Sequence, residues 1–221
     1  MLDAIELASG ANPQSALIVL HGLGADGNDF VPVVQALDLS EIGAVRVILP
    51  HAPVRPVTIN GGYRMRAWYD ILGADLQRRE DEAGLRESQA EVAALVEQEI
   101  ARGIAPERIV LMGFSQGCAM ALLTGLRFAQ RLAGIAGLSG YLPLAASTVA
   151  EAHEANRATP IFLAHGEQDP VVAIDRALAS REALLALGHE VEWHQYPMEH
   201  SVSMEEIADL NAFLVRVLTV D

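Results

Sequence analysis

A strand-to-helix turn with the pattern Gly-x-Ser-x-Gly constrains the fold of this chain more than any other stretch. The apolar run 109–114 has the length and composition of a strand that is buried on both faces. Residues 116–126 are rich in Ala, Leu and Met, which is typical of a buried helix. Ser115 lies between the two, on a turn so sharp that its backbone must be strained. Such a turn lifts the serine hydroxyl out of the core to the edge of the sheet, where a nucleophile is useful.

Strands and helices alternate along the rest of the chain. Further strands are expected at 16–21, 45–50, 135–140, 161–166 and 191–196, and helices at 88–102, 172–187 and after a capping box formed by Ser203 and Glu206. This alternation predicts an α/β fold with a mostly parallel central sheet and helices on both faces. No repeat, low-complexity tract or linker interrupts it. We therefore expect residues 1–221 to form a single domain.

The composition disfavours several classes of protein. Hydrophobic residues make up 51% of the 221, which is too many for a disordered chain, and no apolar run approaches the ~20 residues of a membrane helix. The formal net charge of −14 disfavours binding to nucleic acid or to anionic lipid. The acidic first residues do not resemble a signal peptide, so we expect a cytoplasmic location. The lone cysteine, Cys118, has no internal disulfide partner and fits that location.

A glycine-rich loop, residues 22–27, follows the first expected strand. Its spacing matches a dinucleotide-binding loop, but Asp26 and Asp29 would repel a pyrophosphate. We interpret the loop instead as an oxyanion loop, in which the Leu23 N–H is one donor and the Gln116 N–H is the other. An ordinary tight turn is the simpler alternative.

A long irregular stretch from residue 51 to about residue 82 is broken by several prolines and glycines. An Asn60-Gly61 turn between alternating apolar residues predicts a small hairpin within it. A segment of this length without its own core usually covers a site. Trp68 and Tyr69 either line an apolar slot or fix the segment to the body of the protein, and the sequence leaves both alternatives open.

Three residues with matching chemistry follow three different expected strands. They are Ser115, Asp169 and His200, in the chain order of an α/β-hydrolase triad, and the carboxyl ends of parallel strands meet at one edge of a sheet. We predict that His200 removes the Ser115 proton and that Asp169 fixes the imidazole tautomer. Another histidine, His165, ends a strand and is expected to pack or to cap. Candidates for the substrate slot are Leu23, Trp68, Tyr141 and Val171.

Six motifs carry a resemblance to a known family: residues 20–29, 50–53, 68–70, 113–117, 166–170 and 198–200. In this order they resemble the small bacterial carboxylesterases, which are grouped with acyl-protein thioesterases and lysophospholipases. The resemblance implies a compact α/β-hydrolase fold with no large cap domain, no cofactor and no metal. It further implies a small or lipid-like ester substrate with a short to medium acyl chain, sometimes a thioester, and a possible homodimer.

Three alternatives remain open at this stage. Thioesterase and lysophospholipase activities share the acyl-enzyme route with carboxylesterases, so the sequence does not separate them. A dienelactone-hydrolase-like enzyme would use a cysteine, whereas the nucleophile position holds Ser115 and Cys118 lies one helical turn further on. A non-catalytic acyl-group binder would have no need of an activated serine.

Overall fold

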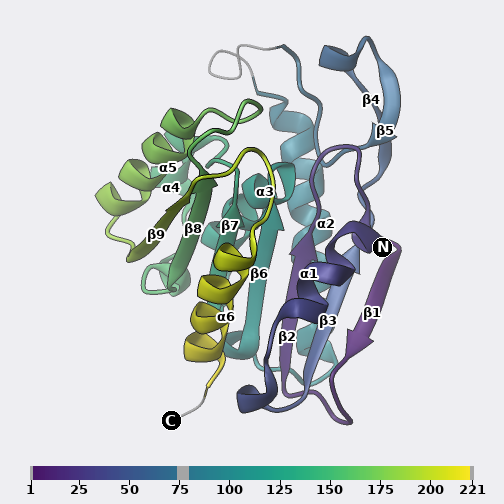
Figure 1. Cartoon of the computed structure of the whole chain (residues 1–221), viewed down its shortest axis with the longest axis vertical. Helices are drawn as coiled ribbons and strands as arrows, with labels where there is room; N and C mark the ends of the chain where they lie inside the picture. The colour runs from purple at the N-terminus through teal and green to yellow at the C-terminus, as the bar shows by residue number, and fades with distance from the viewer. Residues whose placement is uncertain (1, 74–79, 220–221) are drawn as a thin grey trace.

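The computed structural model describes residues 2–73 and 80–219. Within these ranges seven strands form one sheet in the order β1-β3-β2-β6-β7-β8-β9 (Figure 1). The strands are β1 Ala4–Ala8, β2 Ser15–Leu20, β3 Val45–Pro50, β6 Ile109–Phe114, β7 Gly134–Leu138, β8 Ile161–Gly166 and β9 Val191–Tyr196. The pairs from β3 to β9 are parallel, and only β1 joins its neighbour in the antiparallel sense. The mostly parallel sheet expected from the sequence is confirmed.

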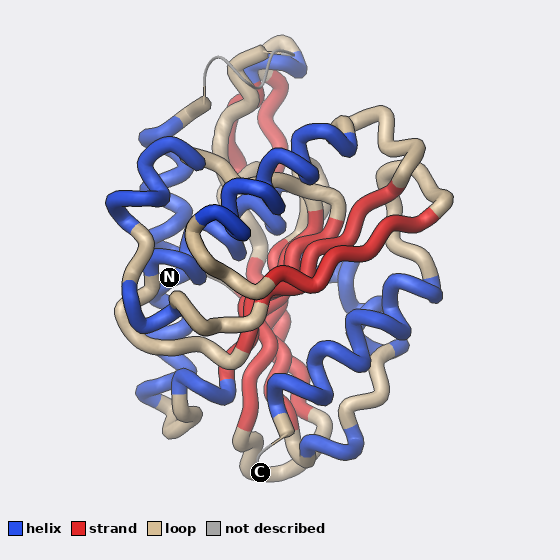
Figure 2. Tube along the Cα trace, turned by 90° about the vertical axis from the view of Figure 1, so that its left-hand side faces the viewer, coloured by secondary structure: helices blue, strands red, loops and turns tan. Residues whose placement is uncertain are grey.

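Helices cover both faces of the twisted sheet (Figure 2). They are α1 Val31–Ala36, α2 Glu82–Ala101, α3 Gln116–Arg127, α4 Ala145–Glu151, α5 Ile174–Ala186 and α6 Met204–Leu218. Side chains of α2, α3 and α5 belong to the core on one face of the sheet, and side chains of α1 and α6 belong to the core on the other face. None of the helices described is long and apolar enough to span a membrane.

The central strand β2 shows why its sequence is a continuous apolar run. Ala16, Ile18 and Leu20 belong to the core on one face, whereas Leu17 and Val19 belong to the core on the other. All five side chains are fully buried. Because successive strand residues point to opposite faces, a strand covered on both sides must be apolar throughout. Burial of each large apolar side chain stabilises the fold by about 1.5–3 kcal/mol.

The predicted hairpin is present as β4 (Val54–Val57) and β5 (Tyr63–Arg66), which pair antiparallel and rise from one end of the molecule (Figure 1). The turn between them contains Gly61 and Gly62, both with positive φ. A residue with a side chain rarely adopts this conformation, so the glycines are needed here.

The structure corrects the predicted helices in two ways. Helix α2 begins at Glu82, six residues earlier than residue 88, because the Asp81 carboxylate accepts a hydrogen bond from the Gly84 N–H at 3.0 Å and caps the helix. The capping box at α6 is only half formed. Ser203 Oγ accepts a hydrogen bond from the Glu206 N–H at 3.1 Å. The Glu206 carboxylate is buried and finds no hydrogen-bond partner among the described residues.

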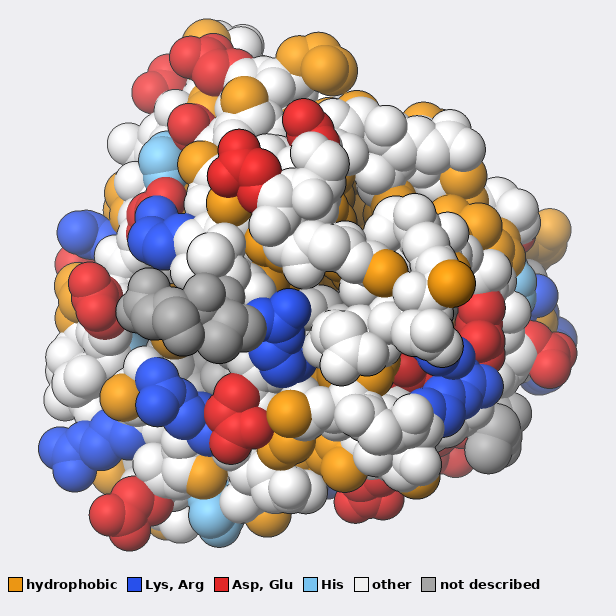
Figure 3. Space-filling view, turned by 90° about the horizontal axis from the view of Figure 1, so that it is seen from below, with side chains coloured by type: hydrophobic (Ala, Val, Ile, Leu, Met, Phe, Trp, Pro, Cys, Tyr) orange, Lys and Arg blue, Asp and Glu red, His pale blue; other side chains and the backbone are white. Residues whose placement is uncertain are grey.

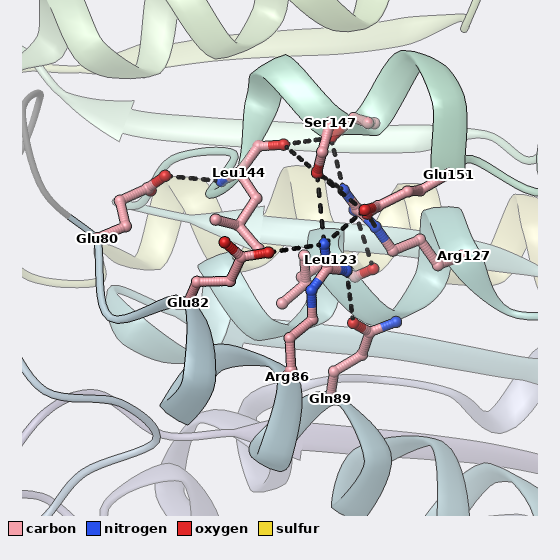
Figure 4. A network of polar contacts seen from close by, with 10 residues as sticks. Glu80, Glu82, Arg86, Gln89, Leu123, Arg127, Leu144, Ser147 and Glu151 are labelled. Atoms are coloured by element: carbon pink, nitrogen blue, oxygen red, sulfur yellow. Dashed lines mark hydrogen bonds and ion pairs between the residues drawn. The ribbon is translucent and has the colours of Figure 1, made fainter.

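A polar network fixes the short helix α4 to α2 and α3 (Figure 4). Arg86 of α2 donates to Glu151 at 2.6 Å, and Arg127 of α3 donates to the same carboxylate at 2.7 Å. These charge-assisted hydrogen bonds, first that of Arg86 and then that of Arg127, lower the pKa of Glu151 to about 2. Glu80 accepts a hydrogen bond from the Leu144 N–H at 3.0 Å, next to the start of α4. The network therefore holds the β7–α4 loop as well as the helix.

The buried carboxyl of Glu206 predicts a pH-dependent stability. Burial raises its pKa from 4.5 to about 8. Such a carboxyl contributes its full stability below the unfolded pKa, where it is neutral in both states. This contribution is lost progressively as the pH rises from the unfolded pKa through the folded pKa. Glu206→Gln stays neutral, so it should gain stability relative to the wild type by roughly 1.36 kcal/mol per pH unit between pH 5 and 8. Urea denaturation across this range measures the difference.

The neighbouring Glu205 is exposed, so Glu205→Gln is the matched control. Its stability should follow that of the wild type at every pH. A Glu206→Gln protein with a constant stability difference from the wild type between pH 5 and 8.5 would contradict the assignment.

Candidate active site

Ser115 lies at the junction of β6 and α3 with φ 56° and ψ −115°, a conformation rare for a residue with a side chain. Strain of this kind costs roughly 1–3 kcal/mol and persists only where the surroundings enforce it. Here the Ser115 N–H donates to the Leu138 carbonyl at 2.9 Å, and its carbonyl accepts from the Ala119 N–H at 3.2 Å. The sharp turn predicted from the sequence is confirmed.

The two glycines of the pentapeptide are required by close approach of the backbone. A Cβ on Gly117 would lie 1.9 Å from the Leu20 carbonyl oxygen, and a Cβ on Gly113 would lie 2.1 Å from the Gly117 oxygen. Both distances are far inside van der Waals contact. Strand β2, strand β6 and helix α3 therefore pack backbone against backbone at this point, which holds the serine turn in place.

The structure brings Ser115, His200 and Asp169 together at the carboxyl ends of β6, β9 and β8. His200 Nε2 lies 2.9 Å from Ser115 Oγ, and His200 Nδ1 lies 2.6 Å from Asp169 Oδ2. Since a carboxylate only accepts, Nδ1 carries the proton and donates it, which leaves Nε2 free to accept from the serine hydroxyl. The arrangement can therefore move a proton from the serine to the imidazole.

The Asp169 side chain is completely buried and held on both oxygens. Oδ1 accepts hydrogen bonds from the backbone N–H groups of Val171 and Val172, at 2.8 and 2.9 Å. Oδ2 is thereby left facing His200. Fixed N–H donors of this kind stabilise a buried carboxylate, whose burial without hydrogen-bond partners would be costly.

His165 stabilises the loop that carries Asp169. Its ring is fully buried, and burial lowers its pKa, so the imidazole is neutral. Its Nε2 lies 2.8 Å from the Val172 carbonyl oxygen and 3.4 Å from Asp169 Oδ2, so Nε2 carries the proton and donates to the carbonyl. The expectation that His165 packs or caps is confirmed.

His21 braces the glycine-rich loop in a similar way. Burial lowers its pKa. Nδ1 donates to the Gly22 carbonyl at 2.7 Å, while Nε2 accepts from the Ala52 N–H at 3.0 Å. Trp68 Nε1 donates to the His21 carbonyl at 2.8 Å. The loop is therefore fixed from both sides before it reaches the site.

Two backbone N–H groups are available beside Ser115. Leu23 and Gln116 line one cavity together with Ser115, and neither N–H donates to an acceptor within the described ranges. A Cβ on Gly22 would lie 3.3 Å from the Phe114 ring and 3.4 Å from Ser115 Cβ, so the loop closely approaches the serine turn. Free donors in this position can bind a negatively charged oxygen.

The cavity has a volume of about 410 Å³. Its lining consists of Leu23, Ile59, Asn60, Tyr69, Ile71, Ser115, Gln116, Tyr141, Pro170, Val171 and Val172. Three of the four slot candidates, Leu23, Tyr141 and Val171, are therefore at the cavity. The sequence named Tyr69 as one of two open alternatives. It did not single out Ile59, Ile71 or Val172, although it predicted the hairpin that carries Ile59 as a cover.

The structure corrects the prediction for Trp68, which does not line the cavity. Its ring is fully buried in the core, and its backbone N–H donates to Gln116 Oε1 at 3.0 Å. Gln116 Nε2 in turn donates to the Tyr69 carbonyl at 3.0 Å. The two open alternatives are thus divided between neighbours: Trp68 fixes the covering segment to the body, and Tyr69 lines the slot.

Cys118 is an unsuitable nucleophile. It is buried, and burial raises the pKa of its thiol to about 12. Since the thiolate is the reactive form, the cysteine is inert at neutral pH. Within residues 2–73 and 80–219, no three His, Cys, Asp or Glu side chains are grouped to hold a metal ion.

Comparison with known proteins gives matches over almost the whole chain. The family model for Phospholipase/Carboxylesterase matches residues 3–218. Acyl-protein thioesterase 1 of Gibberella zeae is 43% identical over 213 residues, 92% of this chain and 91% of that protein. Arabidopsis thaliana SOBER1 has a TM-score of 0.88 at 32% identity, covering 93% of this chain and 99% of its own. Zea mays acyl-protein thioesterase 2 has a TM-score of 0.87 at 28% identity, covering 99% and 100%.

These matches confirm the α/β-hydrolase fold and the family resemblance seen in the sequence. They do not support the bacterial origin in that prediction, because acyl-protein thioesterases that are 43% and 41% identical to this chain come from two fungi, Gibberella zeae and Neurospora crassa.

The backbone contact at Gly117 predicts a large effect of one methyl group. Gly117→Ala should destabilise the protein by about 1–3 kcal/mol or more, because the Leu20 carbonyl must move to admit the Cβ. Gly73→Ala is the control, since nothing lies within 4 Å of a Cβ there. Urea denaturation of both variants measures the effect. Equal midpoints for the two variants would show that the contact is not restrictive.

Proposed function

The chain belongs to the phospholipase/carboxylesterase family, and on that premise we propose that it is a serine carboxylesterase acting through Ser115, His200 and Asp169. Members of this family are serine hydrolases. One observation carries the proposal: His200 lies within hydrogen-bond distance of both Ser115 and Asp169, at 2.9 and 2.6 Å. We further propose that residues 1–221 act as a single domain.

The reaction begins when Ser115 Oγ attacks the ester carbonyl carbon. As the new C–O bond forms, His200 Nε2 takes the serine proton, and the buried Asp169 carboxylate stabilises the resulting imidazolium. His200 then returns the proton to the leaving alcohol or thiol as the ester bond breaks, which leaves an acyl-enzyme. Water adds by the same steps and releases the acid.

The N–H groups of Leu23 and Gln116 are proposed to hold the oxyanion that forms on the carbonyl oxygen. Both residues line the cavity at Ser115. Gln116 is also the first residue of α3, so its N–H belongs to the positive end of a helix dipole. Loss of one such donor costs about 2.7–4 kcal/mol of transition-state stabilisation in other hydrolases.

The size and lining of the cavity at Ser115 favour a short to medium acyl chain as its ligand. Its volume is about 410 Å³, and most of its lining side chains are apolar. Tyr141 and the exposed Val171 are among them. The protein carries a net charge of −14. On the face away from the hairpin, acidic and basic side chains are interspersed (Figure 3). A neutral ester fits these charges better than a polyanion does.

Thioesterase activity is the second candidate function, and the relatives named acyl-protein thioesterase favour it. A thioester reacts by the same route with a thiol as the leaving group. Lysophospholipase activity is a further variant on the same site. Hydrolysis rates for acyl esters and acyl thioesters of increasing chain length separate these activities. A homodimer and a cytoplasmic location remain predictions.

Covalent labelling with a fluorophosphonate tests the nucleophile and distinguishes the enzyme from a non-catalytic acyl-group binder. The wild type should lose activity and gain one adduct on the peptide that carries Ser115. Ser115→Ala should gain none, whereas Cys118→Ala should be labelled like the wild type because its thiol is inert. Mass spectrometry measures the adduct. A folded wild type that is never labelled would leave only the binding function.

A further inference from the structure

Two tyrosines that line the cavity at Ser115 are hydrogen-bonded to each other through their hydroxyls. Tyr69 OH and Tyr141 OH lie 2.7 Å apart, a short hydrogen bond between side chains that are 72 residues apart in the chain. Both residues line the cavity, and both are almost completely buried, with 3% and 6% of their surface exposed. We call them the tyrosine pair.

The tyrosine pair has two hydroxyl hydrogens, and the hydrogen bond between the two tyrosines uses only one of them. Burial raises the pKa of Tyr69 well above its ordinary value and also raises that of Tyr141, so both hydroxyls keep their protons. Two O–H groups supply two hydrogens, and one of them forms the Tyr69–Tyr141 bond. The second hydrogen meets no acceptor among the described residues. A buried donor left without a partner is destabilising, so an acceptor from outside the protein is expected there.

Two other polar side chains beside the serine already take part in hydrogen bonds. Ser115 Oγ is bonded to His200. The Gln116 amide donates to the Tyr69 carbonyl and accepts from the Trp68 N–H. The tyrosine pair therefore adds to this mostly apolar slot a buried donor that has no acceptor among the described residues. The remaining polar lining side chain, Asn60, is exposed and donates to Met65 Sδ at 3.5 Å.

Both tyrosines are held in fixed positions. Tyr69 is fixed through its carbonyl by Gln116. The Arg176 guanidinium lies 3.2 Å from the centre of the Tyr141 ring, a cation–π contact. The loop after Tyr141 is fixed by Glu80, which accepts from the Leu144 N–H, and by the network around α4 (Figure 4). A donor placed so rigidly can select a ligand by the position of an oxygen.

We propose that the tyrosine pair donates a hydrogen bond to an oxygen on the acyl chain, so that the preferred substrates are esters or thioesters whose acyl chain carries a carbonyl, hydroxyl or ether oxygen. The inference rests on the proposed function and names the substrate class of the same site. A plain alkyl chain fills the slot but leaves the hydrogen unpaired. Neutral hydrogen bonds of this kind change specificity by roughly 3–10-fold.

The test compares esters of equal length with and without a ketone oxygen. The probes are p-nitrophenyl hexanoate, 4-oxohexanoate and 5-oxohexanoate, and the readout is the ratio of kcat/KM for each oxo ester to that for the plain ester. The double variant Tyr69→Phe, Tyr141→Phe removes both hydroxyls. Replacing both partners of a hydrogen bond by apolar groups of similar shape is nearly neutral for stability, so this protein should fold. Tyr63→Phe, at an exposed hairpin tyrosine, is the matched control.

At one of the two oxo positions, the ratio in the wild type and in Tyr63→Phe should exceed the ratio in the double variant by about 3–10-fold. Since all three proteins see the same esters, the intrinsic reactivity of each ester cancels. Ratios that are equal in the wild type and in the double variant at both positions would overturn the inference.

A binding measurement separates failure of this inference from failure of the proposed function. Ser115→Ala binds the same esters without turnover, so calorimetry gives their Kd directly. If the wild type hydrolyses nothing while Ser115→Ala still binds an oxo ester about 3–10-fold more tightly than the plain ester, the function fails and the inference stands. If the wild type hydrolyses all three esters and neither measurement shows a preference, the function stands and the inference fails.

Discussion

The position of the serine turn depends on a contact between two backbones, at the point where α3 begins beside β2. Gly117 leaves no room for a side chain against the Leu20 carbonyl, and Gly113 leaves none against Gly117. This contact holds Ser115 at a positive φ and so directs its hydroxyl away from the core. The position of the serine is therefore set by packing of the central sheet, and the strain at Ser115 is held by many neighbours at once.

The remaining groups of the site are positioned by loops that buried histidines brace. His165 holds the loop that carries Asp169, and His21 holds the loop that carries Leu23. Both rings are neutral because burial lowers their pKa, so they act as donors and acceptors of fixed direction. His200, the proposed base, lies in a third loop, after β9. A rigid frame of this kind lowers the cost of ordering the reacting groups during the reaction.

Much of the fold could be predicted because its main signals are local. The strands β6 and β8 are apolar runs that end in chemistry-bearing loops, and their bounds agree with the sequence. The edge strand β1 and the short helix α4 gave little signal, since β1 is half exposed and α4 begins at Ala145, after Leu144, which provides no side-chain cap. In the site, Trp68 could not be separated from Tyr69 by sequence, because which of two adjacent aromatics faces a cavity depends on contacts made by Gln116, far along the chain.

The most direct test of the site is the coupling between Ser115 and His200 in catalysis. If the two act as one unit, Ser115→Ala, His200→Ala and the double variant should each lower kcat by a similar factor, about 10⁶-fold in comparable enzymes. Steady-state rates on one p-nitrophenyl ester provide the comparison. Losses that multiply in the double variant, or a Ser115→Ala protein with the wild-type kcat, would show that the hydroxyl and the imidazole do not act together.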